Sequence, residues 1–115
     1  MRPALAVTAI IFSSLPIATF AQGKGIRLWN LTTATMTGFQ LSPAGQNNWG
    51  PNQTLNDKDK ELDHDERLRL TGVEPGRYDA RVSYVGSRQC IVRDLDIKAD
   101  AVVPVADKDL KDCTP

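Results

Sequence analysis

Residues 67–97 read RLRLTGVEPGRYDARVSYVGSRQCIVRDLDI and carry the strongest secondary-structure signal in the chain. Apolar and polar residues alternate over 67–71 and 78–84, the period that places successive side chains on opposite faces of a strand, and residues 89–97 are a third strand-like stretch. Glu74-Pro75-Gly76 and Gly86-Ser87 have the composition of tight turns. The segment therefore predicts three consecutive strands joined by short turns.

The same alternation assigns the faces of these strands. The core face is expected to hold Tyr78, Ala80, Val82, Tyr84, Ile91, Leu95 and Ile97. The interleaved residues, Asp79 and Asp94 among them, are expected to face solvent. Arginines are interspersed with these acids, so we expect cross-strand ion pairs, with an anion site as the alternative if several arginines share one polar face.

Further strands are predicted on both sides of this segment, at Ile26–Leu31, Met36–Leu41 and Val102–Val105. Pro104 places the last of them at a sheet edge. Residues 42–66 are polar and rich in Pro, Gly and Asn, which is typical of a long loop. We therefore predict an all-β fold, a small antiparallel sandwich or barrel, in a single domain of residues 22–115.

Residues 1–21 have the pattern of a secretory signal peptide. Arg2 precedes an apolar stretch from Ala4 to Ile17, and Thr19-Phe20-Ala21 places small residues where a signal peptidase cleaves. The apolar stretch is too short and interrupted for a stable membrane span. We expect cleavage near Ala21-Gln22 and a periplasmic or secreted protein without a membrane span.

The two cysteines, Cys90 and Cys113, are predicted to form one structural disulfide. Exported chains meet oxidising conditions in which paired thiols persist. A redox pair would need close C-x-x-C spacing, which these residues lack.

Composition argues against several functions. The 14 basic and 14 acidic residues cancel, so bulk positive charge for nucleic acid is missing. A single histidine and two cysteines cannot build a zinc centre of the usual kind. No Gly-x-Ser-x-Gly elbow or phosphate-binding glycine loop follows a strand, and a chain this short is expected to have difficulty enclosing a large pocket. We expect a protein that is not an enzyme and has no cofactor.

The acidic segment 57–66 is the most conspicuous charged feature. Clustered carboxylates are the ligands of Ca²⁺, but the spacing fails the EF-hand pattern because Leu62 and Leu68 occupy the glycine and glutamate positions. A solvated loop is the simpler interpretation, with a calcium-binding or calcium-stabilised domain as the alternative. Its candidate ligands are Asp57, Asp59, Glu61, Asp63 and Asp65.

The candidate partner-binding residues are Trp49, His64 and Glu66. Trp49 lies in the polar loop, where a tryptophan often marks a contact site. His64 lies among acids and is otherwise interpreted as a plain surface residue. Trp29, within a predicted strand, is expected in the core. Two Asn-x-Thr sequences, at Asn30 and Asn52, are glycosylation acceptors only in a host that glycosylates exported chains.

Three short motifs give a resemblance. They are Asn30-Leu31-Thr32, the loop that runs from Ser42-Pro43-Ala44-Gly45 to Trp49-Gly50, and Arg77-Tyr78-Asp79-Ala80-Arg81-Val82. In these the chain resembles a loose group of small exported bacterial β-rich proteins of unknown function. It departs from them at Gly76, where such proteins often have a cysteine. The resemblance implies a periplasmic, non-enzymatic β protein and carries over no ligand or catalytic residue.

The sequence therefore predicts a small exported protein that binds another protein or an envelope component. The alternatives are the calcium-dependent domain and a secreted inhibitor of a hydrolase that presents a rigid loop.

Overall fold

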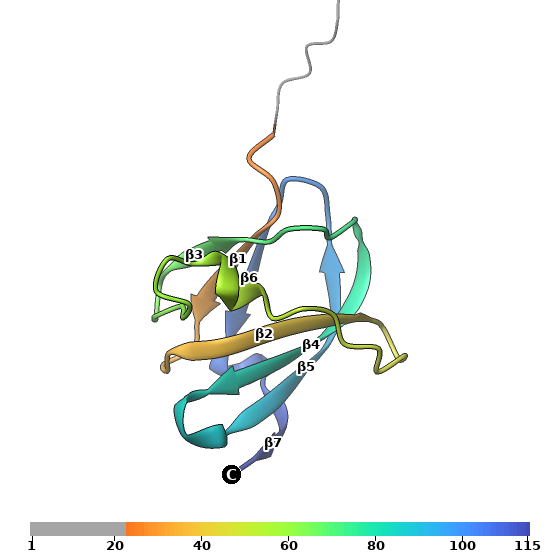
Figure 1. The fold of residues 1–115 in the computed structure, drawn as a ribbon. Helices are drawn as coiled ribbons and strands as arrows, with labels where there is room; N and C mark the ends of the chain where they lie inside the picture. Colours follow the sequence, from red (N-terminus) through yellow and green to blue (C-terminus); the bar gives the residue numbers. More distant parts are fainter. Residues whose placement is uncertain (1–22) are drawn as a thin grey trace, which may run out of the picture.

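The computed structural model describes residues 23–115, so the predicted signal peptide and its cleavage site lie outside the described residues. Apart from three short 3-10 turns, regular structure there is all strand (Figure 1). The strands are β1 (Arg27–Leu31), β2 (Met36–Pro43), β3 (Arg67–Arg69), β4 (Gly76–Tyr84), β5 (Gln89–Ile97), β6 (Val102–Ala106) and β7 (Lys111–Thr114). The all-β prediction is confirmed. In residues 23–115, no helix is long and apolar enough to cross a membrane.

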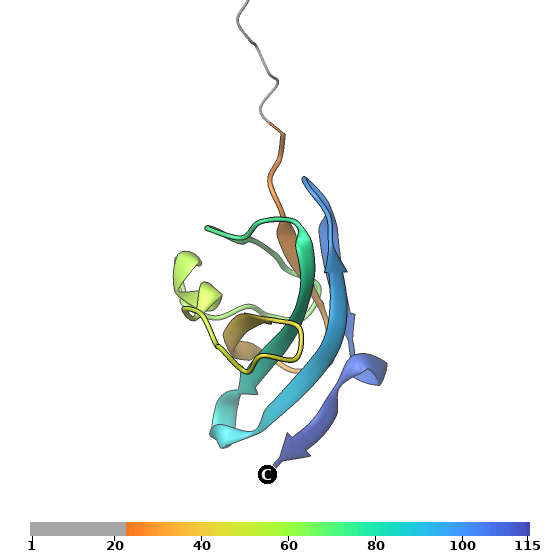
Figure 2. The same ribbon diagram turned by 90° about the vertical axis from the view of Figure 1, so that its right-hand side faces the viewer.

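The strands form two sheets that pack face to face (Figures 1 and 2). One sheet has the order β3-β1-β6 and the other β2-β4-β5-β7. All pairings are antiparallel except that of β1 with β6, which is parallel. The β1–β6 pair is therefore an exception to the predicted antiparallel sandwich.

The core lies between the sheets and is built by inward-facing alternate residues. Leu28 of β1, Phe39 of β2, Val82 of β4 and Val105 of β6 are completely buried. Leu62, from the long loop, is also completely buried and exchanges two backbone hydrogen bonds with Met36. Leu62 therefore anchors the acidic segment to the sheet, and residues 42–66 have a defined path.

A bulge in β5 changes which residues face the core. Asp94 adopts a left-handed conformation with φ of 57°, and the β4–β5 register shifts at the same point. Cys90 and Val92 are buried before the bulge, whereas Ile97 is buried after it. The residues that face the core are therefore even-numbered before the bulge and odd-numbered after it. The prediction that Ile91 shares a face with Leu95 and Ile97 is wrong.

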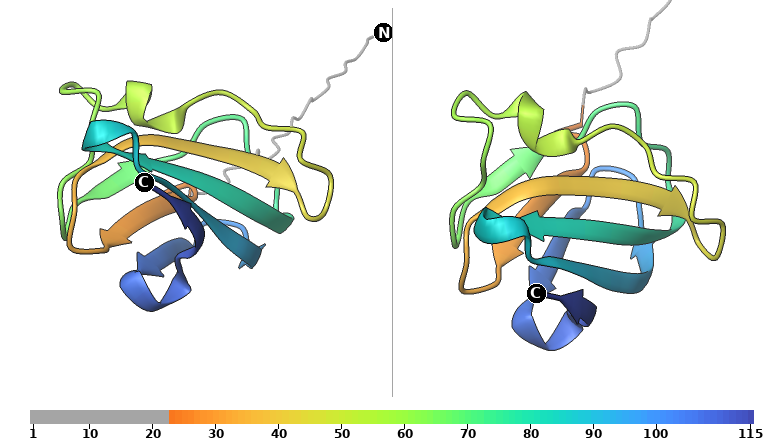
Figure 3. Two further views of the ribbon diagram at one scale, coloured as in Figure 1. Left: turned by 90° about the horizontal axis from the view of Figure 1, so that it is seen from below. Right: turned by 60° about the horizontal axis from the view of Figure 1, so that its bottom comes forward.

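The long loop covers the outer edge of β2 (Figure 3). The side-chain amide of Asn52 accepts a hydrogen bond from Phe39 N–H at 2.9 Å and donates one to the Thr37 carbonyl at 3.1 Å. Gly50 N–H donates to the Leu41 carbonyl at 2.8 Å. A side-chain amide has the same donor and acceptor as a peptide group, so Asn52 satisfies edge groups that would otherwise be free to pair with another chain.

The loop also covers the end of β3. Gln53 accepts a hydrogen bond from Thr71 N–H and donates to the Thr71 carbonyl, at 3.0 and 2.9 Å. Asn56 Nδ2 lies 3.4 Å from the Arg69 carbonyl oxygen. Both strand edges on this side of the sandwich are therefore capped by side-chain amides.

The two Asn-x-Thr sequences form the same local structure. Asn30 Oδ1 accepts hydrogen bonds from Thr32 N–H and Oγ1, and Asn52 Oδ1 accepts the same two from Thr54. Asn30 and both threonines are completely buried. Polar groups that leave water must be paired, which these bonds achieve. The two sequences are therefore structural elements of the fold.

Candidate binding site

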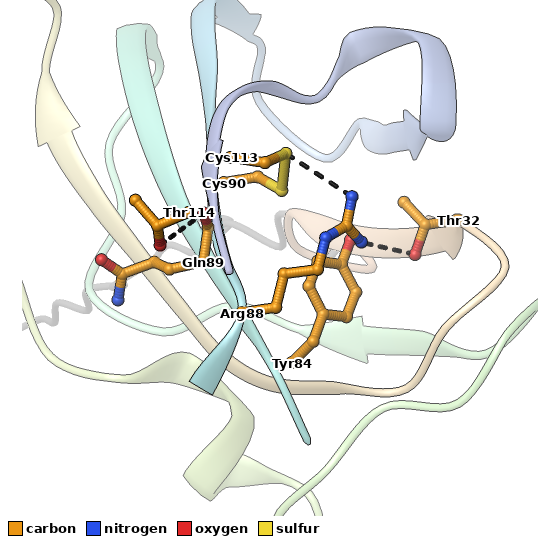
Figure 4. The surroundings of a disulfide bond; sticks show 7 residues. All are labelled: Thr32, Tyr84, Arg88, Gln89, Cys90, Cys113 and Thr114. Carbon is orange, nitrogen blue, oxygen red and sulfur yellow. Dashed lines mark hydrogen bonds between the residues drawn. A yellow bond between two sulfur atoms is a disulfide. The ribbon is translucent and has the colours of Figure 1, made fainter. Parts of the chain in front are cut away.

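The predicted disulfide is present and fastens the C-terminal strand to the sheet. Cys90 of β5 and Cys113 of β7 are bonded across 23 residues, with their Cα atoms 4.0 Å apart (Figure 4). Cys90 is completely buried, whereas every residue of β7 is exposed. The Arg88 guanidinium lies 5.4 Å from the Tyr84 ring centroid beside the bond. Since β7 contributes no buried side chain, it is held by the disulfide and by its pairing with β5.

The acidic residues of segment 57–66 do not converge. Within residues 23–115, no group of three or more His, Cys, Asp or Glu side chains could hold a metal ion. Asp57 accepts a hydrogen bond from Asp59 N–H, Asp63 from the Thr35 hydroxyl and Asp65 from Trp29 Nε1. These carboxylates take part in local structure, and the calcium hypothesis remains a prediction.

The predicted partner-binding residues all lie in the loop between β2 and β3 but contact different parts of the fold. Trp49 is half-buried on the outer face of the four-stranded sheet, where Arg81 Cζ lies 4.9 Å from its ring centroid. His64 contacts the β1–β2 turn, where its Nδ1 is 2.8 Å from the Thr32 carbonyl oxygen. That oxygen can only accept, so Nδ1 carries the hydrogen. Glu66 accepts a hydrogen bond from Asp63 N–H at 2.9 Å, so each of the three side chains has a different contact.

Asp79 is a buried carboxylate that sequence alternation assigned to the solvent face. Its side chain accepts hydrogen bonds from Gly45 N–H and Asp94 N–H, both at 2.9 Å, and lies 3.4 Å from Arg93 Nη1. The bond from Gly45, followed by that from Asp94, lowers the pKa of Asp79 below its ordinary value in spite of burial. Asp79 thus holds the turn after β2 against the bulge of β5.

A cleft of about 680 Å³ opens between β5 and β6, on the side of the sandwich that the long loop does not cover. This volume is within the range of ligand-binding pockets and is larger than we expected for so short a chain. The cleft has an apolar floor, formed by Leu31, Val92, Leu95, Pro104 and Ala106. Its rim is charged and balanced in sign, with Arg93, Lys108 and Lys111 against Asp94, Asp96 and Asp109.

The charges of the rim are held in place by local contacts. Arg93 bridges Asp79 and Asp112, at 3.4 Å from each. Asp109 accepts hydrogen bonds from Ala106 N–H at 2.9 Å and from Lys108 at 3.1 Å. Burial alone would raise the pKa of Asp109, but these two bonds together with the charges of Lys108 and Lys111 outweigh it, and the pKa lies below its ordinary value. Asp109 therefore stays ionised at neutral pH in a position fixed by its contacts.

Neither strand that borders the cleft offers a regular edge for strand addition. In β6, Pro104 has no N–H, and the Ala106 N–H is already bonded to Asp109. In β5, β7 pairs only as far as Ile91, and the Asp94 bulge follows. Proline and bulges are the devices by which proteins prevent edge-to-edge pairing. The cleft is therefore suited to receiving side chains rather than an added strand.

Comparison of the chain with family models, with curated proteins and with solved structures found no match.

Proposed function

We propose that this protein is an exported binding protein that acts on a partner protein of the cell envelope through the cleft between β5 and β6. The single observation that carries this proposal is the contrast between the two sides of the sandwich. Side-chain amides cap the strand edges beside the long loop, whereas the opposite side has an open cleft of about 680 Å³ with an apolar floor and a charged rim. An apolar pocket with a polar rim is the usual anatomy of a protein-binding surface.

The chemistry of the cleft favours a partner that inserts an apolar side chain flanked by charges of both signs. The floor would bury that side chain, and Arg93, Lys108 and Asp109 would pair with its charged neighbours. Binding rather than catalysis is favoured because the only histidine contacts a backbone carbonyl and lies outside the cleft lining. The hollow lined by Gly50 and Pro51, next to Trp49 in the chain, has a volume of about 180 Å³, which is smaller than the cleft.

Export is supported by the disulfide together with the pattern of residues 1–21. The bond between Cys90 and Cys113 is one that persists in an oxidising compartment. We expect the chain recovered from the envelope fraction to begin near Gln22 and to carry no free thiol. Intact mass analysis with and without a thiol-alkylating reagent tests this, and a full-length reduced chain in the cytoplasm would refute it.

Site-specific photocrosslinking in the producing cell tests the cleft. A photoreactive residue at Ala106, which lines the cleft, is compared with one at Val85, which is 72% exposed at the β4–β5 turn and outside the cleft. We expect a dominant adduct from position 106 that position 85 does not give.

The same adduct should disappear when Leu95→Glu places a charge on the apolar floor. The Val85→Glu variant is the matched control, because it adds the same charge at an exposed position away from the cleft. Identical adducts from positions 106 and 85, or an adduct that survives Leu95→Glu in a folded protein, would refute the cleft as the contact site.

A further inference from the structure

The outer face of the three-stranded sheet carries three arginines, one from β1 and two from β3. The register pairs Arg69 of β3 with Arg27 of β1, and Arg67 with Trp29. The alternating residues of both strands are buried in the core, so these four side chains lie on the outer face. The prediction that Trp29 is a core residue is therefore wrong. We call Arg27, Arg67 and Arg69 the basic face.

Two of these guanidinium groups converge on one glycine. Arg27 Nε donates to the Gly25 carbonyl at 3.2 Å, and Arg27 Nη2 donates to the Asp100 carbonyl at 3.2 Å. The Arg69 side chain lies so close to Gly25 that a Cβ there would come within 2.9 Å of Arg69 Nε. Like charges on directly opposite residues of a sheet are destabilising. The fold therefore holds two positive charges together at a cost.

No acidic partner offsets that cost. In the described part of the chain, no carboxylate oxygen lies within 4.0 Å of a nitrogen of the basic face. The two aspartates nearby accept hydrogen bonds from neutral donors, Asp65 from Trp29 Nε1 at 2.9 Å and Asp100 from Gly25 N–H at 3.0 Å. The predicted cross-strand ion pairs do form elsewhere, as in Arg77–Asp94. The basic face thus has the unpaired positive charge that an external anion can neutralise.

The environment of Arg67 narrows the class of anion. Its Cζ lies 4.2 Å from the centroid of the Trp29 ring, so the guanidinium occupies the position that a sugar or nucleobase would need for stacking. A stacked guanidinium keeps its edge N–H groups for bidentate binding of phosphate. The register adds Val102 beside Arg27. Arginine, tryptophan and an apolar residue on one face fit the headgroup layer of a bilayer.

We propose that the basic face docks on a bilayer containing anionic phospholipids, with Arg27, Arg67 and Arg69 binding headgroup phosphates. The chain has 14 basic and 14 acidic residues, so its attraction to such a surface depends on this face and not on net charge. The inference goes beyond the proposed partner cleft. Because the basic face and the cleft share no residue, an experiment can refute one of the two proposals without bearing on the other.

Co-sedimentation with vesicles tests the proposal. The purified chain is mixed with vesicles of phosphatidylcholine alone or of phosphatidylcholine with phosphatidylglycerol, and the partition coefficient is measured. We expect binding only to the anionic vesicles, weakened by added salt because exposed charges are screened. Each arginine near an anionic leaflet contributes a factor of about five, so Arg67→Gln with Arg69→Gln should lower the coefficient roughly thirty-fold.

The matched control is Arg77→Gln with Lys98→Gln, which removes the same charge from exposed residues that already have ion-pair partners. This control should bind like the unchanged chain, and all proteins share the same N-terminal segment. Equal losses in both double variants, or binding to pure phosphatidylcholine, would overturn the proposal. Competition by soluble tripolyphosphate at the same phosphate concentration as the lipid would identify a free anion as the ligand and would equally overturn it.

Discussion

Replacing Asn52 by alanine should unfold the edge of β2 and cost about 3 kcal/mol of stability. Phe39 is completely buried, and the substitution leaves its N–H without the Asn52 acceptor, at a cost of about 1–3 kcal/mol. Loss of the bond to the Thr37 carbonyl adds about 1 kcal/mol. For a domain of this size the melting midpoint should fall by roughly 12–24 °C.

Urea unfolding followed by tryptophan fluorescence measures this change. Asn52→Asp keeps the acceptor for Phe39 N–H but sets an oxygen against the Thr37 carbonyl, so its loss should be about half as large. The exposed Asn48, whose side chain makes no hydrogen bond within residues 23–115, is the control, and Asn48→Ala should cost less than about 0.5 kcal/mol. Size-exclusion chromatography should also show self-association of Asn52→Ala through the uncovered edge. An Asn52→Ala protein as stable as Asn48→Ala would refute the edge-capping argument.

Four further outcomes are expected. In urea unfolding, the free energy of unfolding of Cys113→Ser should be about 3.4 kcal/mol lower, which is the chain-entropy value for the 23-residue separation of the cysteines. A midpoint of the unchanged protein that does not respond to reductant would contradict this. The pKa of Asp79 is lowered, so its ionised carboxylate stabilises the folded state above pH ~4, and this stabilisation is lost as the pH falls through the folded-state pKa. Asp79→Asn should therefore make the free energy of unfolding depend less on pH in acid. Burial raises the pKa of Tyr84, so the unfolded chain loses the phenol proton first and the free energy of unfolding falls above pH ~10. Tyr84→Phe should remove this fall. The same fall in both proteins would exclude Tyr84 as its cause. Adding Ca²⁺ to a chelated sample should leave the thermal midpoint unchanged, because the carboxylates of 57–66 do not converge, and a rise would favour the calcium hypothesis.

Hydrophobic alternation predicted most of the fold. It located β5 with its observed bounds and the other strands from β1 to β6 to within a few residues, because most of their inward positions are apolar. It missed β7, whose residues KDCT are all exposed and are held by Cys113. It also misassigned Trp29, because the buried positions of β1 are Leu28 and Asn30 and the latter is polar.

The candidate site was less predictable than the strands. The cleft depends on where β5 bends, and the Asp94 bulge is fixed by its hydrogen bond to Asp79, 15 residues earlier in the chain. Such a contact has no periodic signature in the sequence. The edge caps likewise depend on Asn52 and Gln53 meeting β2 and the end of β3, and a loop rich in Asn and Gln does not indicate which of its amides are used.

The paired roles of Asn30 and Asn52 have a consequence for producing the protein. In a eukaryotic secretory pathway an oligosaccharyltransferase modifies asparagine while the chain is still emerging, before the Nδ2 atoms reach their carbonyl partners. An N-glycan on Asn30 would have to fit where the Asn30 side chain is completely buried. An N-glycan on Asn52 would displace its amide from the edge of the sheet. Yeast or mammalian hosts should therefore yield misfolded glycoforms, whereas a bacterial host avoids them.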